Sequence, residues 1–370
     1  MKKTVSLLFI LILLTACTTT SEANPTPPVV GTVIESDFTN PLTVVELGAG
    51  YGVRGDWFEL YFTDPSSPLA AQETGGPDGP LVNAIDNARL SVDVAIYSLS
   101  LNSVRDALLR AHDRGVRVRM VMESDNLDRS DPQKLKDAGI PILGDRREGL
   151  MHNKFVVIDN LEVWLGSMNF TDSGAYKDNN NLMKIRSTKL AEDFTAEFEE
   201  MFVDDIFGPD LGNPTPNPRV TIDGTNIDVY FAPEDHAQAA LFDLVDSVAQ
   251  ASIYFMAYSF TADPIGNAIR SASAEGLTVA GVMDADQIKS NLGTEYDPFK
   301  QAGLEVYEDN IPGLMHHKVM IIDDSIVVFG SYNFTNSAET NNDEVLLVIY
   351  NADIAAQFKA EFFRVFRSAQ

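Results

Sequence analysis

A polar pattern that occurs twice, 164 residues apart, constrains this chain more than any other feature. Both copies have the spacing HxKxxxxD: His152, Lys154 and Asp159 in the first, and His316, Lys318 and Asp323 in the second. Each is followed by a turn and then by Gly-Ser-x-Asn-Phe-Thr. One His–Lys pair alone would most simply be an ordinary half-exposed strand. Two otherwise divergent halves are not expected to keep the same polar residues by drift, so the duplication indicates a functional site.

Each copy has the composition of a β-hairpin. Runs rich in Val, Ile and Met flank a polar turn, and such residues favour strands. Alternate residues of a strand share a face, so the His and the Lys of one motif should point the same way. The Asp follows the Lys by five residues and should face away or lie in the turn. We therefore expect Asp159 and Asp323 to support the framework.

The rest of the chain repeats as well, with alternating strands and helices. Strands are predicted at 91–98 and 252–259, and helices at 103–114 and 264–275, each helix followed by a glycine suited to a left-handed cap. Later helices carry Phe194, Phe198, Phe358 and Phe362 at four-residue spacing, which favours a core role. The predicted fold is α/β, a tandem duplication with repeats at 40–207 and 220–370 and a Pro-containing linker at 208–219.

The N-terminal residues read as a targeting segment rather than as part of the fold. Residues 1–16 combine two lysines with a short apolar run, as a secretory signal does. The end of this run, Leu-Thr-Ala-Cys, resembles the lipobox of bacterial lipoproteins, which implies a lipid on Cys17. Cys17 is the only cysteine, so an internal disulfide and a cysteine metal site are excluded. Residues 17–39 read as a Pro-containing tether.

Charge limits the choice of partners. The formal net charge is −27, which should repel polyanions and weakens the case for tight binding of duplex DNA. A local positive cleft around two lysines remains compatible with it.

Two repeats related by approximate two-fold symmetry can bring their matched hairpins to one axis. The cleft would then hold two imidazoles and two ammonium groups, a set suited to a phosphodiester. One imidazole can attack phosphorus while the other protonates the leaving oxygen. Asn169, Asn333, Ser167 and Ser331 could donate further hydrogen bonds. This chemistry needs no metal or cofactor, and we find no carboxylate cluster at ligand spacing along the sequence.

The paired motifs resemble those of the phospholipase D superfamily, over nearly the whole mature chain. The resemblance implies a shared cleft, a phosphohistidine intermediate and a catalytic quartet of His152, Lys154, His316 and Lys318, with Asp159 and Asp323 completing the signature. It also places Ser167, Asn169, Ser331 and Asn333 at phosphate-contacting positions. Glu344 matches an acidic residue that orients a catalytic His, whereas the first repeat has Asn180 there. Which His Glu344 contacts is left open, as is the choice of nucleophile.

The resemblance leaves three substrates open. We expect a monomeric, extracytoplasmic hydrolase of phospholipid head groups, held on a bacterial membrane through Cys17. The alternatives are an endonuclease, for which Arg146 and Arg147 could guide a phosphate backbone, and a phosphatidyltransferase similar to cardiolipin synthase. The simpler interpretation is that the two arginines lie in a solvated loop and bind no ligand.

Overall fold

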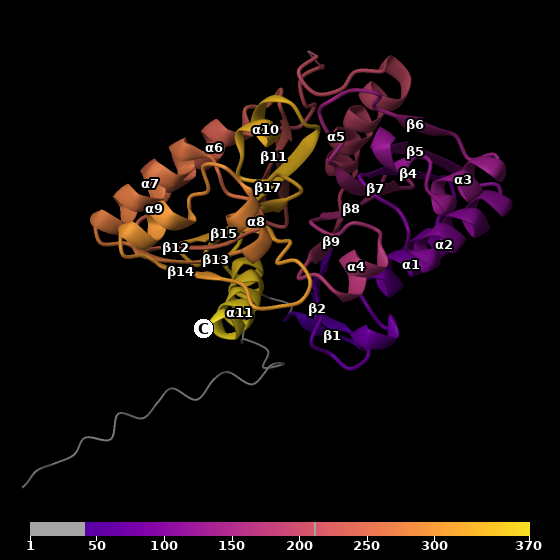
Figure 1. Cartoon of the computed structure of the whole chain (residues 1–370). Coiled ribbons are helices and arrows are strands. Elements are labelled where there is room, and N and C mark those ends of the chain that lie inside the picture. The colour runs from indigo at the N-terminus through magenta and orange to yellow at the C-terminus, as the bar shows by residue number, and fades with distance from the viewer. Residues whose placement is uncertain (1–40, 211) are drawn as a thin grey trace, which may run out of the picture. The chain divides into compact units, whose positions relative to one another are not determined.

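The computed structural model describes residues 41–210 and 212–370. The predicted signal segment, the tether up to residue 39 and Cys17 lie outside these residues. Two sheets form the framework, one in each repeat (Figure 1). None of the helices in the described part of the chain combines the length and apolar character needed to cross a bilayer.

The first sheet has nine strands in the order β1-β2-β3-β9-β8-β7-β4-β5-β6. They are β1 (Thr43–Leu47), β2 (Gly50–Arg54), β3 (Phe58–Thr63), β4 (Ser91–Ile96), β5 (Arg117–Met122), β6 (Ile142–Gly144), β7 (Lys154–Ile158), β8 (Glu162–Gly166) and β9 (Asn181–Arg186). The helices of this repeat are α1 (Asp78–Asn87), α2 (Asn102–Asp113), α3 (Ser130–Asp137), α4 (Asp172–Tyr176) and α5 (Thr188–Glu199).

The second sheet has eight strands in the order β10-β11-β17-β16-β15-β12-β13-β14. They are β10 (Arg219–Ile222), β11 (Thr225–Ala232), β12 (Ser252–Ala257), β13 (Thr278–Met283), β14 (Glu305–Glu308), β15 (Lys318–Ile322), β16 (Ile326–Gly330) and β17 (Glu344–Tyr350). Its helices are α6 (Ala237–Asp243), α7 (Asp263–Ala274), α8 (Ala285–Ser290), α9 (Tyr296–Gln301), α10 (Asn336–Thr340) and α11 (Ala352–Ala369).

The two sheets share one topology, which confirms the predicted tandem duplication. From β3 to β6 the strand order matches that from β11 to β14 element by element, with β4 and β12 in the same central place. The predicted strands at 91–98 and 252–259 are β4 and β12, and the predicted helices at 103–114 and 264–275 are α2 and α7. Gly115 and Gly276 follow these helices with φ of 86° and 102°, the left-handed conformation expected of a cap. The sequence did not predict the β1–β2 hairpin at the edge of the first sheet.

Both motif hairpins form as predicted, β7–β8 and β15–β16, with antiparallel pairing. Each hairpin lies beside the central strand of its sheet. Lys154 pairs with Ile96 of β4, and Lys318 pairs with Ala257 of β12. The two lysines therefore lie next to Tyr97 and Tyr258, the residues that follow those strands.

The helices α5 and α11 join the two repeats into one core. Phe194 of α5 packs against Phe231 of β11, with ring centroids 5.1 Å apart, and Phe358 of α11 packs against Phe62 of β3 at 5.2 Å. Each helix thus contacts the sheet of the other repeat, and one hydrophobic cluster runs through both. This confirms the core role predicted for the aromatic stripes, and it fixes the two hairpins relative to each other.

Candidate active site

The two motif histidines line one cleft. His152 and His316 both border a cavity of about 530 Å³, together with Tyr97, Tyr258, Asn169 and Asn333. The ring of Tyr97 packs edge-on against His152 at 5.2 Å, and Tyr258 packs in the same way against His316 at 4.8 Å. The motifs therefore converge, as two-fold symmetry of the repeats predicted.

Each lysine lies beside the histidine of its own motif. Lys154 Nζ donates to the carbonyl oxygen of His152 at 2.7 Å, and Lys318 Nζ donates to that of His316 at 2.8 Å. The ammonium groups also lie over the tyrosine rings, 5.4 Å from Tyr97 and 4.5 Å from Tyr258. Both lysines are buried, so two amino groups that can carry positive charge lie close to where a phosphate would bind.

Short segments from each repeat cross over to hold the histidine of the other. Asp343 forms a backbone bridge to Met151, and Asn179 forms the equivalent bridge to Met315. The backbone N–H of His152 donates to the carbonyl of Asp343 at 3.0 Å, and that of His316 donates to Asn179 at 3.0 Å. Neither half-site is complete without the opposite repeat.

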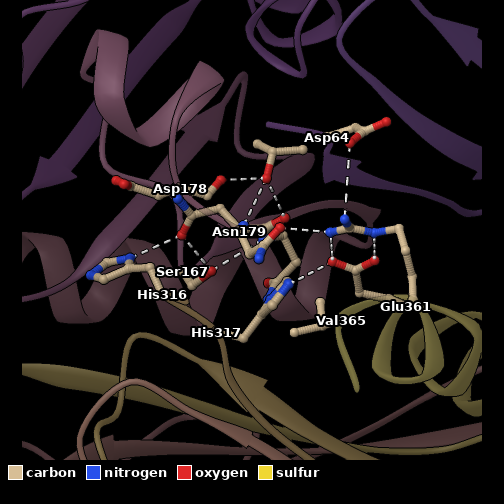
Figure 2. Close-up of polar contacts among 12 residues, drawn as sticks. Asp64, Ser167, Asp178, Asn179, His316, His317, Glu361 and Val365 are labelled. Carbon is tan, nitrogen blue, oxygen red and sulfur yellow. Dashed lines mark hydrogen bonds and ion pairs between the residues drawn. The ribbon is translucent and has the colours of Figure 1, made fainter. Parts of the chain in front are cut away.

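The crossing segments also determine how each imidazole is held. His152 Nδ1 lies 2.8 Å from Glu344 Oε2. His316 Nδ1, whose ring is labelled in Figure 2, lies 2.9 Å from Asn180 Oδ1. Both partners are acceptors, so each Nδ1 carries the proton and Nε2 is left for chemistry. No described residue hydrogen-bonds either Nε2. Glu344 therefore contacts His152, which the sequence had left open, and it orients this ring instead of binding substrate directly.

Burial dominates the proton affinity of the site. It lowers the pKa of His152 to about 4, a fall that Glu344 opposes and Lys154 increases. It lowers the pKa of Lys154 to about 7. The pKa values of His316 and Lys318 are also well below their usual ranges, because burial is reinforced by the neighbouring cations. A bound phosphodiester anion would offset this repulsion, so the site favours an anionic ligand.

The two asparagines of the Gly-Ser-x-Asn-Phe-Thr segments face the cleft. Asn169 and Asn333 both line it, and their buried Oδ1 atoms have no hydrogen-bond partner among the described residues. Each amide is therefore free to orient toward a ligand.

The two serines of these segments play a different part from the predicted phosphate contact. Ser167 Oγ accepts from the backbone N–H of Asn181 at 3.1 Å, and Ser331 Oγ accepts from that of Val345 at 3.0 Å. Ser167 Oγ also donates to Asn180 Oδ1 at 2.8 Å. Neither serine lines the cleft, so both position the crossing segments. The preceding glycines allow this approach, because a Cβ on Gly330 would lie 2.1 Å from the carbonyl oxygen of Val345.

Asp159 and Asp323 belong to the framework, as the strand spacing predicted, so these two members of the signature are not catalytic residues. Both occupy left-handed positions in the hairpin turns, with φ of 55° and 51°. The Asp159 carboxylate accepts from the N–H groups of Arg89, Leu90 and Ser91. The Asp323 carboxylate accepts from those of Gln250, Ala251 and Ser252. Each Asp thus fixes its hairpin to the start of the central strand.

Sequence reasoning missed several cleft residues. Tyr97 and Tyr258 follow matched strands, and this repeated aromatic position was the available signal. The second repeat alone supplies Gln287 and Asn291, which hydrogen-bond each other at 3.1 Å along one wall. These two residues belong to no recognisable sequence motif, because they come from α8 and the residue after it, and only the fold brings them to the cleft.

The two arginines considered for a nucleic-acid backbone are engaged within the protein. Arg146 pairs with Asp205 and donates to the carbonyl of Gly144. Arg147 donates to the carbonyls of Phe207 and Asn341. Neither lines the cleft, so the local basicity does not form a free basic patch.

Folding does create a carboxylate cluster that the sequence did not reveal. Glu197 and Glu200 of the first repeat meet Glu234 of the second, with one ligand-type oxygen of each within 4.8 Å of the others. Carboxylate oxygens are the donors that hard divalent cations prefer. The cluster lies outside the cleft lining, however, so it supplies no group to the His–Lys site.

Comparisons with known proteins agree with this geometry. The family model described as "Cardiolipin synthase, PLD-like domain" matches residues 81–202 and 245–366, one match in each repeat. The chain therefore belongs to the phospholipase D superfamily.

Individual relatives fall in the same superfamily. A phospholipase D of Rickettsia bellii is 29% identical over 191 residues, which cover 48% of this chain and 94% of the relative. The human mitochondrial cardiolipin hydrolase is 32% identical over 132 residues, covering 35% of this chain and 52% of the relative. The crystal structure of a phosphatidylserine synthase from Haemophilus influenzae covers 79% of this chain and 84% of its own, with a TM-score of 0.61 and 15% identity, and so shows the fold. The phospholipase D and cardiolipin hydrolase relatives support a phosphodiesterase function.

Proposed function

We propose that this protein is a metal-independent phosphodiesterase of the phospholipase D type, which removes the head group of a phospholipid through a phosphohistidine intermediate. The observation that carries this proposal is the pair of histidines on one cleft, each with its Nδ1 fixed by the opposite repeat. Fixed tautomers leave two Nε2 atoms for opposite tasks on one phosphorus.

The reaction divides into two displacements. In the first, Nε2 of one imidazole attacks phosphorus and the bond from phosphorus to the head-group oxygen breaks. The second imidazole, as imidazolium, gives its proton to that oxygen. Water then attacks phosphorus, the now neutral second imidazole takes the proton from water, and the phosphorus–nitrogen bond breaks. Lys154, Lys318, Asn169 and Asn333 stabilise the non-bridging oxygens in both steps.

The unlike partners of the two rings favour His152 as the nucleophile. Attack leaves the nucleophilic ring positively charged, and the Glu344 carboxylate stabilises that charge directly. His316 faces the neutral amide of Asn180, which holds a proton less strongly and suits a ring that must release it. The cross-repeat pairing thus gives the two equivalent motifs different roles.

A phospholipid fits the site better than a nucleic acid. Besides the two histidines, the cleft wall carries amides, hydroxyls, tyrosines and leucines. The two lysines are not part of this wall but are hydrogen-bonded to the backbone of its histidines, and the two arginines considered for a nucleic-acid backbone are paired elsewhere. The net charge of −27 also opposes binding of a long polyanion. If an alcohol resolves the intermediate in place of water, the same site acts as a phosphatidyltransferase.

We further propose that a lipid on Cys17 holds the enzyme on the extracytoplasmic side of a bacterial membrane, where its substrate lies.

The test compares substrates under one condition. Purified protein in EDTA, at fixed moderate salt, is given phosphatidylglycerol vesicles, phosphatidylcholine vesicles and single-stranded DNA. We expect head-group release from vesicles and no shortening of DNA. His152→Asn and His316→Asn should each reduce turnover by about 10³-fold or more, because the two roles are complementary.

Covalent trapping separates the roles. With an activated p-nitrophenyl phosphodiester, whose leaving group needs no proton, His316→Asn should accumulate label on His152, whereas His152→Asn should not become labelled. Substantial turnover in both variants, a requirement for a divalent ion, or faster cleavage of DNA would contradict the proposed function.

A further inference from the structure

The second motif contains a histidine that the reaction does not use. His317 is fully buried, whereas the matched position in the first repeat is Asn153. Its Nδ1 lies 2.9 Å from the amide nitrogen of Asn181, and its Nε2 lies 2.9 Å from Glu361 Oε1. An amide nitrogen can only donate, so Nδ1 accepts and Nε2 donates to the carboxylate. His317 therefore links β9 of the first repeat to α11 of the second (Figure 2).

Helix α11 completes this link with a buried ion pair. Arg364 Nε and Nη2 donate to both oxygens of Glu361, at 2.6 and 2.7 Å. Burial alone would raise the pKa of Glu361, but Arg364 and His317 outweigh it and lower this pKa to about 2. Arg364 Nη2 also donates to Asn179 Oδ1 at 2.6 Å. The carboxylate is thus charged and is held by Arg364, His317 and the hydroxyl of Tyr51, which also donates to it.

These contacts fall on either side of one residue. Arg364 holds the side chain of Asn179, and His317 is hydrogen-bonded to the side chain of Asn181. Between them lies Asn180, whose Oδ1 receives the Nδ1 proton of His316. We propose that His317, Glu361 and Arg364 form a clamp whose role is to position Asn180 against His316. They are positioning residues, since none of them lines the cleft.

The first repeat shows why only one half-site has such a clamp. At the positions that match His317, Glu361 and Arg364 it has Asn153, Glu197 and Glu200, so helix α5 and the residue after it supply no guanidinium. The guanidinium beside Asp343, which matches Asn179, comes instead from Arg147 at 3.6 Å. The ring on that side, His152, is held by the charged Glu344. A charged hydrogen bond is roughly twice as strong as a neutral one, so the neutral Asn180–His316 contact depends more on external support.

The inference rests on the proposed function. Its test uses two substrates, of which only phosphatidylglycerol needs His316 to protonate the leaving group. Arg364→Met should leave the burst of p-nitrophenol from the activated diester, because attack by His152 and departure of this leaving group do not need His316. Steady-state turnover of phosphatidylglycerol should fall about 10- to 100-fold in kcat, with KM changed less than about threefold. His317→Asn, which restores the residue of the first repeat, should act in the same direction and guards against misfolding of Arg364→Met.

The matched control is Arg119→Met. Arg119 of β5 bridges Asp93 of β4 and Glu199 of α5, at 2.8 and 2.7 Å, and α5 is the helix equivalent to α11. The Arg119 side chain is 11% exposed, against 19% for Arg364. This variant should lose stability but keep kcat. A kcat within twofold of wild type in folded Arg364→Met and His317→Asn, or an equal loss in Arg119→Met, would overturn the positioning role.

A readout without turnover separates this inference from the proposed function. In the NMR spectrum of the full chain, the Nδ1 proton of His316 should exchange faster with solvent in Arg364→Met, while that of His152 stays unchanged. Unaltered exchange at His316 would reject the clamp even if the enzyme proved to act on another diester. Failure of wild type to form a phosphohistidine would instead reject the proposed function and leave the exchange result to decide the clamp.

Discussion

At the scale of single residues, the two half-sites differ in the group that accepts the Nδ1 proton of the histidine. Glu344 and Asn180 occupy matched positions, yet one offers a carboxylate to its imidazole and the other an amide oxygen. The charge is worth most on the ring that becomes positive during the reaction. In the proposed mechanism, this one difference between the repeats is what makes one histidine the nucleophile and the other the general acid.

Glu344→Gln should test that difference. The amide keeps the hydrogen-bond geometry but removes the charge, and a hydrogen bond to a charged group contributes roughly 1.5–3 kcal/mol, so kcat should fall about 10- to 100-fold. Because the carboxylate raises the pKa of His152 against the effect of burial, its loss should also move the acidic limb of the kcat/KM profile to lower pH. A rate profile measured from pH 3.5 to 8 checks both. An unmoved limb would mean that His152 is not the ring that must be neutral.

At the scale of elements, sequence reasoning reached the strands and helices but not their crossings. Val- and Ile-rich runs around a polar turn were sufficient to predict the hairpins, and four-residue aromatic spacing was sufficient for α5 and α11. The crossing segments ending at Asn180 and Glu344 were not predictable, because their role comes from the opposite repeat. The serines after β8 and β16 were misread for the same reason, since their partners are backbone groups of neighbouring strands.

Helix α5 carries a cost that α11 avoids. Where α11 pairs Glu361 with Arg364, Glu197 at the end of α5 and Glu200 just after it lie beside Glu234 and near Asp343. Burial, joined by repulsion among the carboxylates, raises the pKa of Glu197 far above its usual value and that of Glu234 to about 7. The unfolded chain releases these protons near pH 4.5, whereas the folded chain keeps that of Glu234 until about pH 7 and that of Glu197 to a pH well above its usual range. This cluster therefore reduces stability as pH rises between those values.

Glu234→Gln should remove part of this loss of stability, because a neutral amide can lie beside Glu197 without binding a proton. We expect the free energy of unfolding to rise by about 1–2 kcal/mol at pH 8 and to change little at pH 4.5. Urea denaturation at the two pH values measures it. Glu199→Gln is the control: Glu199 lies on α5 with Glu197 but is paired with Arg119, so its replacement should give no gain at pH 8. Equal effects at both pH values would show that the carboxylates do not share protons as inferred.

At the scale of the whole molecule, an acidic body surrounds a cationic cleft. The formal charge of −27 repels an anionic membrane surface, while the two buried lysines of the cleft require a phosphodiester to reach them. Attraction by charge cannot bring such an enzyme to lipid. The lipid anchor proposed above would resolve the conflict, because it would raise the local concentration of substrate without adding positive charge.

Cys17→Ser should therefore separate location from chemistry. We expect the variant to move from the membrane fraction to the soluble fraction, since the acyl chains that the thiol would carry are lost. Its kcat on a soluble p-nitrophenyl phosphodiester should equal that of wild type, because Cys17 precedes the repeats that build the cleft. Its rate on intact vesicles should fall about 100-fold with the loss of effective concentration. Membrane fractionation and the two assays, run on the same preparations, check these outcomes. Unchanged fractionation would refute the anchor, and an equal loss on both substrates would show that residues around Cys17 also support the folded site.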